Sequence, residues 1–159
     1  VGSVGHLGVC YPGPAVGLNG VSEGSPICYE GLYGNFYGGF VRERARALLI
    51  SSNDGWWGDT PGHKHLFSIA RLRAVDRRRA LARSASTGTS GVLDTRGDVQ
   101  QKLGWDRRGI LTGEVALNSE LTFYTRYGDY LGRNSELHMG LCILYYIAYR
   151  IKKKNHLVK

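Results

Sequence analysis

The chain has 159 residues, 42% of them hydrophobic, which is enough for about one globular domain and argues against an intrinsically disordered protein. Its 23 glycines and only 4 prolines favour an α/β or β-rich fold with many tight turns over a helical bundle. The formal charge of +8 is concentrated in residues 71–83 and 150–159 and is not interleaved with aromatic residues, so we expect no nucleic-acid partner.

The beginning of the chain is a glycine-rich segment, residues 1–20, without a secretory signal. It lacks an initiator methionine, a basic start and a continuous apolar stretch. We interpret it as an interior loop and expect the natural protein to begin upstream of Val1.

Two apolar segments, residues 25–29 and 47–52, are predicted to form β-strands. The first ends at Cys28, and the second closes on a polar turn at residues 53–55. Residues 31–46 have about the length of a crossover helix, although three glycines weaken the helical pattern. This succession favours two parallel strands in one sheet.

The next part of the chain is predicted to contain one helix and several short strands. Residues 63–79 carry apolar side chains at helical spacing among charged ones. Strands are expected at residues 81–84, 89–93, 99–103 and 110–115, separated by turns that contain glycine. The turn at residues 95–98 has the composition of a β-hairpin.

The end of the chain, residues 131–159, differs in character from residues 1–130, which we assign to one domain. Residues 137–149 are almost all apolar or aromatic, and a basic tail follows at once. This pattern predicts a membrane helix with a cytoplasmic flank. Because a span needs about 20 apolar residues, a buried terminal helix and an interfacial segment are the alternatives.

Cysteine usage points to one informative thiol. The three cysteines have no spacing that suits zinc, so we expect no metal and no other cofactor. Cys142 lies in the apolar run, where a small buried hydrophobe is the simplest interpretation. Cys28 stands at a strand end on the turn into a helix, near helix N–H groups that favour a thiolate, and this position suits a nucleophile. The alternative, from position alone, is a buried small residue.

Two neighbours extend the hypothesis of a nucleophilic Cys28. Glu30 adds an ionisable group beside the thiol, and the backbone N–H of Tyr29 is placed to stabilise an oxyanion. A favourable charge at the start of a helix is the plainer interpretation of Glu30.

Three motifs in succession carry a family resemblance. They are Pro-Ile-Cys-Tyr-Glu at residues 26–30, Ser-Asn-Asp-Gly-Trp-Trp-Gly at 52–58 and Gly-His-Lys-His at 62–65. The succession resembles the nitrilase domain of apolipoprotein N-acyltransferases. The resemblance continues through residues 70–74, 82–88 and 121–129, and it leads us to expect the C-terminal part of such an enzyme.

This resemblance implies an incomplete αββα sandwich whose active site holds a cysteine nucleophile, a lysine and a glutamate base. Cys28 matches the nucleophile, and Glu30 matches a second glutamate that supports catalysis beside it. The lysine and the base would lie before Val1, so this chain alone is expected to be inactive. Asp76 and Ser86 depart from the family pattern, in which glutamate and asparagine are usual.

The resemblance also implies a two-step acyl transfer on the periplasmic side of the bacterial inner membrane. The Cys28 thiolate would take an acyl chain from a phospholipid as a thioester, and the amine of an apolipoprotein's diacylglyceryl-cysteine would then attack it. A thioester suits this split reaction because thiolate is a good leaving group. The expected partners are phospholipid, apolipoprotein and the membrane.

Substrate contact is assigned to the motif that follows the second strand, through Asn53, Asp54, Trp56 and Trp57. Tryptophan is favoured where apolar matter meets a wet interface, which fits a lid over lipid chains. Two core aromatics that anchor a loop are the alternative.

The charged and histidine-rich segments receive plainer interpretations. His63 and His65 are interpreted as hydrogen-bonding residues at a helix start, in preference to metal ligands or bases. Residues 71–83 are interpreted as ion pairs and solvated surface, with contact to phospholipid headgroups as a minor alternative.

Two other functions stay open. A soluble carbon–nitrogen hydrolase would use the same thiol on nitriles or amides with water as acceptor, although the Trp-rich motif and the apolar end of the chain speak against it. A catalytically dead membrane-associated scaffold would keep the fold without the chemistry.

Overall fold

The computed structural model describes residues 16–18 and 21–157, with side chains from residue 21 to residue 153. The chain divides into two compact units, residues 1–128 and residues 129–159. The expectation of an interior loop before residue 16 lies outside the described residues.

The first unit is built on one sheet of six strands in the order β1-β2-β3-β4-β5-β6. The strands are β1 (Val16–Leu18), β2 (Val21–Gly24), β3 (Ala47–Ser52), β4 (Leu81–Ala85), β5 (Ser90–Leu93) and β6 (Val99–Leu103). The three central strands β2, β3 and β4 are parallel, and the outer pairs are antiparallel. Strand β3 is thus in a parallel pair as predicted, but its partner is β2 and not residues 25–29. The carboxyl ends of β2, β3 and β4 meet at one edge of the sheet.

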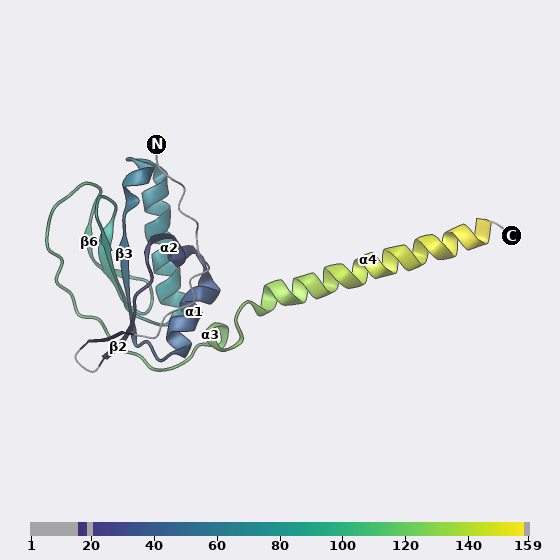
Figure 1. Cartoon of the computed structure of the whole chain (residues 1–159), viewed down its shortest axis with the longest axis horizontal. Helices are drawn as coiled ribbons and strands as arrows, with labels where there is room; N and C mark the ends of the chain where they lie inside the picture. The colour runs from purple at the N-terminus through teal and green to yellow at the C-terminus, as the bar shows by residue number, and fades with distance from the viewer. Residues whose placement is uncertain (1–15, 19–20, 158–159) are drawn as a thin grey trace. The chain divides into compact units, whose positions relative to one another are not determined.

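Helices α1 (Gly34–Arg42) and α2 (Pro61–Arg77) follow β2 and β3 and cover the same face of the sheet (Figure 1). The start of α2 has strong local signals, since Pro61 stands at its first position and the Thr60 hydroxyl accepts the Gly62 amide. It ends where Arg78 takes a left-handed conformation, with φ of 49°. The expected helix over residues 63–79 is confirmed with a start two residues earlier.

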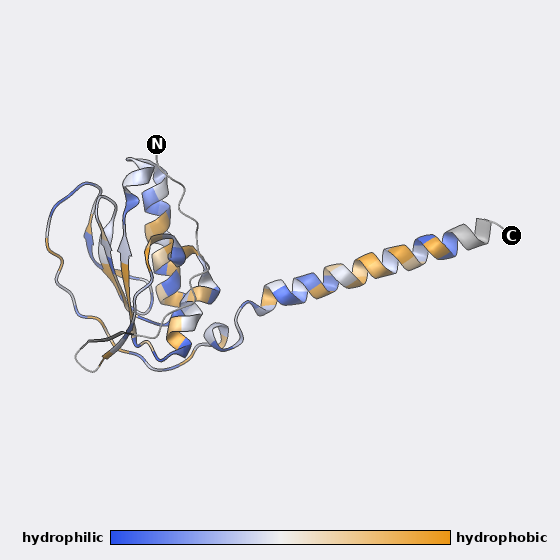
Figure 2. Ribbon diagram, in the orientation of Figure 1, coloured by the Kyte–Doolittle hydropathy of each residue, from blue (hydrophilic) through white to orange (hydrophobic). Residues whose placement is uncertain are grey.

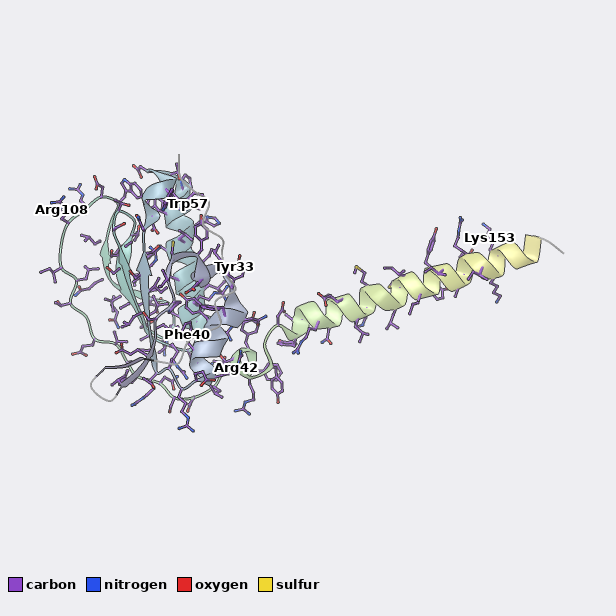
Figure 3. All side chains as sticks on the ribbon, viewed as in Figure 1. Tyr33, Phe40, Arg42, Trp57, Arg108 and Lys153 are labelled. Carbon is purple, nitrogen blue, oxygen red and sulfur yellow. The ribbon has the colours of Figure 1, made fainter. Side chains whose placement is uncertain are left out.

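The core lies between these helices and the sheet. Leu48 and Leu81 on the central strands have no exposed surface, and they belong to one cluster with residues of both helices. Phe40 of α1, labelled in Figure 3, is one of the core side chains in this cluster. Burial of these side chains is what holds the helices to the sheet.

Two glycines of α1 give room for arginines of α2. A Cβ atom at Gly34 would lie 2.6 Å from a guanidinium nitrogen of Arg73, and one at Gly38 would lie 3.0 Å from a guanidinium nitrogen of Arg77. The glycines that weaken the helical pattern of this segment are thus explained by the close approach of two charged side chains.

Two strand predictions need correction. Residues 25–29 do not form a regular strand, because β2 ends at Gly24 and only Ile27 makes a single parallel bridge, to Ser51 of β3. Residues 110–115 form no strand. They belong to a segment that crosses the sheet face opposite the helices, where a Cβ at Gly113 would lie 3.0 Å from the Val92 side chain. The chain passes over the sheet instead of pairing with its edge.

The hairpin between β5 and β6 agrees with its prediction. The Asp94 carboxylate accepts the amides of Arg96 and Asp98, each at 2.8 Å. Gly97 has a φ of 78°, a left-handed conformation that favours glycine. This turn explains why the composition of residues 95–98 was informative.

The second unit holds helix α4 (Tyr130–Leu157), whose middle is its most apolar part (Figure 2). Within the range that the structure describes, no helix combines the length and apolar character needed to cross a bilayer. The predicted membrane-spanning helix over residues 131–159 is therefore not borne out. The physical reason is that the apolar run lies between His138 and Arg150, whereas a span takes about 20 residues. Cys142, expected to be buried, is exposed on this helix.

Candidate active site

Three turns meet at the carboxyl edge of the parallel strands. The turn after β2 carries Cys28 and becomes a 3-10 helix, η1 (Cys28–Leu32). The turn after β3 forms a second 3-10 helix, η2 (Asp54–Trp57), and residues 86–89 connect β4 to β5. Side chains at the carboxyl ends of neighbouring parallel strands converge in α/β folds, and ligands bind there.

Cys28 is half-buried and is the first residue of η1. Its φ is 48°, a left-handed conformation that is unusual for any residue other than glycine and costs free energy. Such conformations cluster at functional sites, where the surrounding structure holds them in place. The helix after Cys28 differs from the prediction, because α1 begins only at Gly34 and therefore does not place its N-terminal amides at the thiol.

Glu30 and Tyr29 lie on the same turn as Cys28. The Glu30 carboxylate accepts a hydrogen bond from the backbone amide of Ile27 at 2.7 Å, and this bond closes the turn. The Tyr29 amide donates to no acceptor among the described residues, which leaves this N–H available to an oxyanion. The Tyr29 ring is exposed and lies 6.1 Å from the Trp57 ring, centroid to centroid.

Asn53 links the turns after β3 and β4. Its side-chain oxygen accepts the Ser86 hydroxyl at 2.7 Å and the Gly55 amide at 3.2 Å. Asn53 is exposed at the edge of the sheet. The serine that stands where asparagine was expected is therefore in contact with the motif, and Asn53 is still accessible to a substrate.

Asp54 is completely buried, which excludes direct contact with substrate in this structure. Its two carboxylate oxygens accept hydrogen bonds from one guanidinium nitrogen of Arg83, at 2.9 and 3.0 Å. The Ser52 hydroxyl donates to the same carboxylate, and a Cβ at Gly88 would lie only 1.9 Å from it. In this structure the Asp54 carboxylate supports the site by fastening η2 to β4. Its substrate-binding role stays a prediction.

The two tryptophans of η2 differ in environment. Trp56 is 84% exposed, whereas Trp57 is 37% exposed and packs against Gly62 and Tyr29. Figure 3 labels Trp57 and Arg42 at opposite ends of the first unit. Trp56 therefore fits the predicted aromatic tip, and Trp57 fits the alternative of a ring that anchors the turn.

Alanine substitution should separate these two roles. We expect Trp56→Ala to change the free energy of unfolding by no more than about 0.5 kcal/mol and to weaken binding to phospholipid vesicles. Trp57→Ala should cost a sizeable fraction of the about 3–5 kcal/mol typical of a buried Trp→Ala change. Thermal melting and vesicle sedimentation measure the two effects. An equal loss of melting temperature in both variants would show that Trp56 is an anchor as well.

His63 is a buried hydrogen-bonding residue, as predicted. Its Nε2 lies 3.4 Å from the Asp59 carboxylate, its Nδ1 lies 3.5 Å from the Thr89 hydroxyl, and its ring stacks on Trp105 at 4.6 Å. Within the described part of the chain, no group of three or more His, Cys, Asp or Glu side chains is placed to hold a metal ion.

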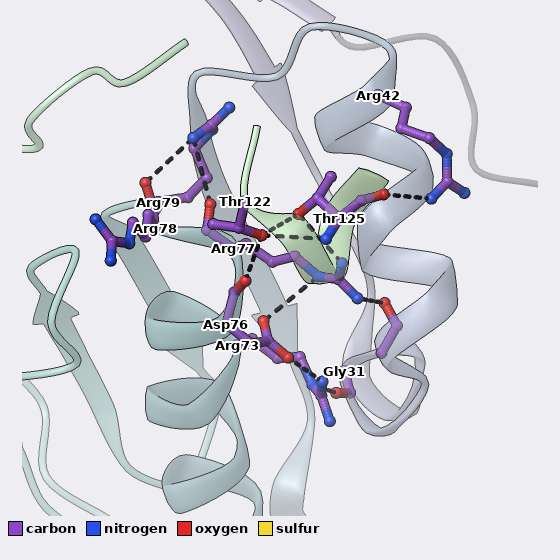
Figure 4. A network of polar contacts seen from close by, with 10 residues as sticks. Gly31, Arg42, Arg73, Asp76, Arg77, Arg78, Arg79, Thr122 and Thr125 are labelled. Atoms are coloured by element: carbon purple, nitrogen blue, oxygen red, sulfur yellow. Dashed lines mark hydrogen bonds and ion pairs between the residues drawn. The ribbon is translucent and has the colours of Figure 1, made fainter. Parts of the chain in front are cut away.

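Three arginines of residues 71–83 are buried, contrary to the predicted solvated surface, whereas the predicted ion pairs are present, between Asp76 and two arginines (Figure 4). Arg77, Arg79 and Arg83 are each at most 5% exposed. Burial raises the pKa of the Asp76 carboxyl, while Arg77 and Arg73 beside it oppose the rise. Burial lowers the pKa of Arg77, and Asp76 opposes that fall. Backbone carbonyls replace water as the partners of these guanidinium groups.

This edge of the sheet carries the half-buried thiol of Cys28, the Tyr29 amide and the two turns that Asn53 and Asp54 support. A model of the family described as Carbon-nitrogen hydrolase matches residues 3–121. The chain belongs to the carbon-nitrogen hydrolase family. The expected superfamily is therefore confirmed.

Several apolipoprotein N-acyltransferases are similar to this carbon-nitrogen hydrolase chain. The one from Chlorobaculum tepidum is 39% identical over 103 residues, which make up 65% of this chain and 19% of the relative. The one from Geobacter metallireducens is 31% identical over 130 residues, 82% of this chain and 25% of the relative. The resemblance to these enzymes is confirmed, and the chain spans about a fifth to a quarter of their length.

Solved structures support the nitrilase-like α/β fold of this carbon-nitrogen hydrolase chain. An amidase from Nesterenkonia sp. matches with a TM-score of 0.53 at 20% sequence identity, over 82% of this chain and 47% of the amidase. A mutant of the Nesterenkonia AN1 amidase, described as a member of the nitrilase superfamily, matches with a TM-score of 0.51.

Proposed function

We propose that Cys28 is the acyl carrier of an apolipoprotein N-acyltransferase. The observation that carries the proposal is the geometry of the turn after β2. There a half-buried thiol in a left-handed conformation lies beside the Tyr29 amide, which has no acceptor among the described residues. The names of the most similar relatives supply the substrate class. The Nesterenkonia amidase, which shares the fold, forms a covalent adduct at its own active-site cysteine.

In the proposed first step, the Cys28 thiolate attacks the carbonyl carbon of a phospholipid acyl ester. A C–S bond forms, the ester C–O bond breaks, and the lysophospholipid leaves as an alcohol after it takes up a proton. The Tyr29 amide donates to the oxyanion of the tetrahedral intermediate. The products are a thioester on Cys28 and a lysophospholipid.

In the second step, the α-amine of an apolipoprotein's diacylglyceryl-cysteine attacks the thioester carbonyl. An amide bond forms, the C–S bond breaks, and the thiolate of Cys28 is regenerated as the amine loses a proton. The glutamate base and the lysine that the resemblance implies would manage this proton and the oxyanion, so residues 1–159 alone should not suffice. Glu30 keeps the turn closed during both steps, through its bond to Ile27.

The membrane partner is supported by exposed apolar side chains. Trp56 stands at the edge that carries Cys28, and α4 exposes large apolar residues along its middle: Leu137, Met139, Leu141, Ile143, Leu144, Tyr145, Tyr146, Ile147 and Tyr149. Exposed patches of this kind mark protein or membrane contacts. We propose that α4 contacts a bacterial inner membrane through these side chains. From the similarity to apolipoprotein N-acyltransferases alone, we propose that the catalytic unit faces the periplasm.

The experiment that tests the function separates transfer from hydrolysis. The intact protein is incubated with a phospholipid labelled in one acyl chain, with and without a diacylglyceryl-cysteine peptide. We expect label on the peptide amine and little free fatty acid. Label released as free fatty acid, together with turnover of small amides, would favour the soluble hydrolase instead. Neither product, from a protein that melts cooperatively, would favour the scaffold.

A further inference from the structure

We infer that Arg73, held by Asp76, is a positioning residue for the Cys28 thiol, an inference that rests on the proposed function of Cys28. Arg73 lies on α2, 45 residues after the cysteine, and nothing in its own stretch of sequence marks it out among its arginine neighbours. Its importance comes from the carbonyl that it holds.

The first contact joins Arg73 to the turn that carries the thiol. Its Nε donates to the carbonyl oxygen of Gly31 at 3.2 Å, and Gly31 belongs to the same 3-10 turn as Cys28 (Figure 4). The Arg73 side chain is only 11% exposed, so water competes little for this bond. The bond therefore restrains the turn from the side of α2.

The second contact fixes the guanidinium itself. The Asp76 carboxylate binds Arg73 with one oxygen and lies 3.4 Å from Nε of Arg77 with the other. Arg77 in turn donates to the carbonyl of Gly34, the first residue of α1. One carboxylate thus orients two arginines, and these hold the carbonyls of Gly31 and Gly34, on either side of the link between η1 and α1.

The support continues beyond the carboxylate. The Thr125 hydroxyl lies 3.2 Å from Arg77, and the Thr122 hydroxyl donates to the backbone carbonyl of Asp76 at 2.8 Å. Thr122 and Thr125 also contact each other at 2.9 Å. These threonine contacts hold Asp76 and Arg77 in place without Arg73. We therefore expect the loss of Arg73 to displace the turn of Cys28.

The thiol needs such support because its backbone is strained. A left-handed residue other than glycine persists only where surrounding contacts over-determine it. Among the described residues, the bond from Arg73 is the one side-chain hydrogen bond that reaches η1 from another element. The rings of Tyr37 and Trp57 also lie against η1, at Gly31 and Tyr29. Arg73 therefore ties the turn of Cys28 to α2, whereas the bond between Glu30 and Ile27 acts within the turn.

The same helix offers a matched control. Arg71, two residues earlier, donates from its Nε to the carbonyl of Gly97 at 2.8 Å. The bond type, the helix and the glycine acceptor are the same, but Gly97 lies in the turn between β5 and β6. Arg71→Gln removes an equivalent bond without touching the turn of Cys28.

The test compares Arg73→Gln, Arg71→Gln and the parent in the intact protein. The rate constant for alkylation of Cys28 by iodoacetamide is followed by peptide mass spectrometry across pH 6–10, beside the melting temperature. We expect Arg73→Gln to lower the rate constant for alkylation at pH 7 about tenfold and to shift its pH profile. The reason is that the reactivity of a thiol depends on its local environment, which changes when the turn is displaced. Arg71→Gln should lower the melting temperature less, because Arg71 is exposed, and it should leave the Cys28 profile unchanged.

A second pair of variants keeps the inference testable if Arg73→Gln does not fold. Asp76→Asn should reproduce the altered profile, and Asp76→Glu, which retains the carboxylate, should restore it. Unchanged alkylation of Cys28 in Arg73→Gln or in Asp76→Asn would overturn the inference. An altered profile in a protein that transfers no acyl group would overturn the proposed function and support the positioning role.

Discussion

Replacement of Cys28 by alanine is expected to abolish acyl capture completely. Incubated with a phospholipid labelled in its acyl chain, the intact protein should trap label in a hydroxylamine-sensitive thioester, and Cys28→Ala should trap none. The reason is that, of the two described cysteines, Cys28 is the one on the turn that carries the Tyr29 amide. Alanine keeps the left-handed backbone and removes only the sulfur.

The other cysteines supply the controls for this experiment. Cys142→Ala removes a thiol that is exposed on α4, and Cys10→Ala removes the one remaining cysteine besides Cys28. Both variants should trap as much label as the parent protein. Label that persists in Cys28→Ala, or that disappears in Cys142→Ala, would move the nucleophile elsewhere.

The second large effect is expected on stability. Arg83→Leu should lower the free energy of unfolding by about 3–5 kcal/mol, because it leaves the Asp54 carboxylate charged, buried and without its guanidinium partner. Arg83 also donates to the carbonyl of Thr89 at 2.7 Å, and this acceptor would lose its donor as well. Urea unfolding of the intact protein measures the loss.

Two further variants make this stability prediction specific. Arg108 is exposed, and Arg108→Leu should change the free energy of unfolding by no more than about 0.5 kcal/mol. The double variant Arg83→Leu with Asp54→Leu removes both charges and should recover part of the loss. If Arg83→Leu were no more harmful than Arg108→Leu, the buried pair would contribute nothing to stability.

Much of the sheet and helix succession could be predicted, because hydrophobic periodicity reports which face of an element is buried. Residues 47–52 were predicted with their observed bounds, and the helix of residues 63–79 was displaced by two residues. Residues 110–115 were mistaken for a strand because they have strand composition, but they cross a sheet face without pairing. Strand composition does not specify a pairing partner.

The arginines were misjudged for a different physical reason. A charged residue in a helix is exposed unless particular partners accept it, and those partners are distant in sequence. Arg73 bonds a carbonyl 42 residues away, and Arg83 pairs with a carboxylate 29 residues away. The glycines at positions 34 and 38 were the one local signal, since a helix with small residues on one face leaves room for large side chains from a neighbour.

The place of the candidate residues in the fold could be predicted, whereas the contacts that support them could not. Short motifs placed Cys28, Glu30 and Asn53 at the carboxyl edge of parallel strands, where the structure has them. The same motifs did not reveal that Asp54 is buried or that Trp57 anchors a turn. Burial is a property of the packed chain, so a motif alone does not report it.

The left-handed conformation of Cys28 sets stability and chemistry against each other at one position. Glycine adopts this backbone freely, whereas a residue with a Cβ pays roughly 1–2 kcal/mol for it. Selection for a higher melting temperature would therefore favour Cys28→Gly, and the selected protein would be more stable but would lack its acyl carrier. Engineering of this fold for thermal robustness should hold position 28 constant and look for gains elsewhere.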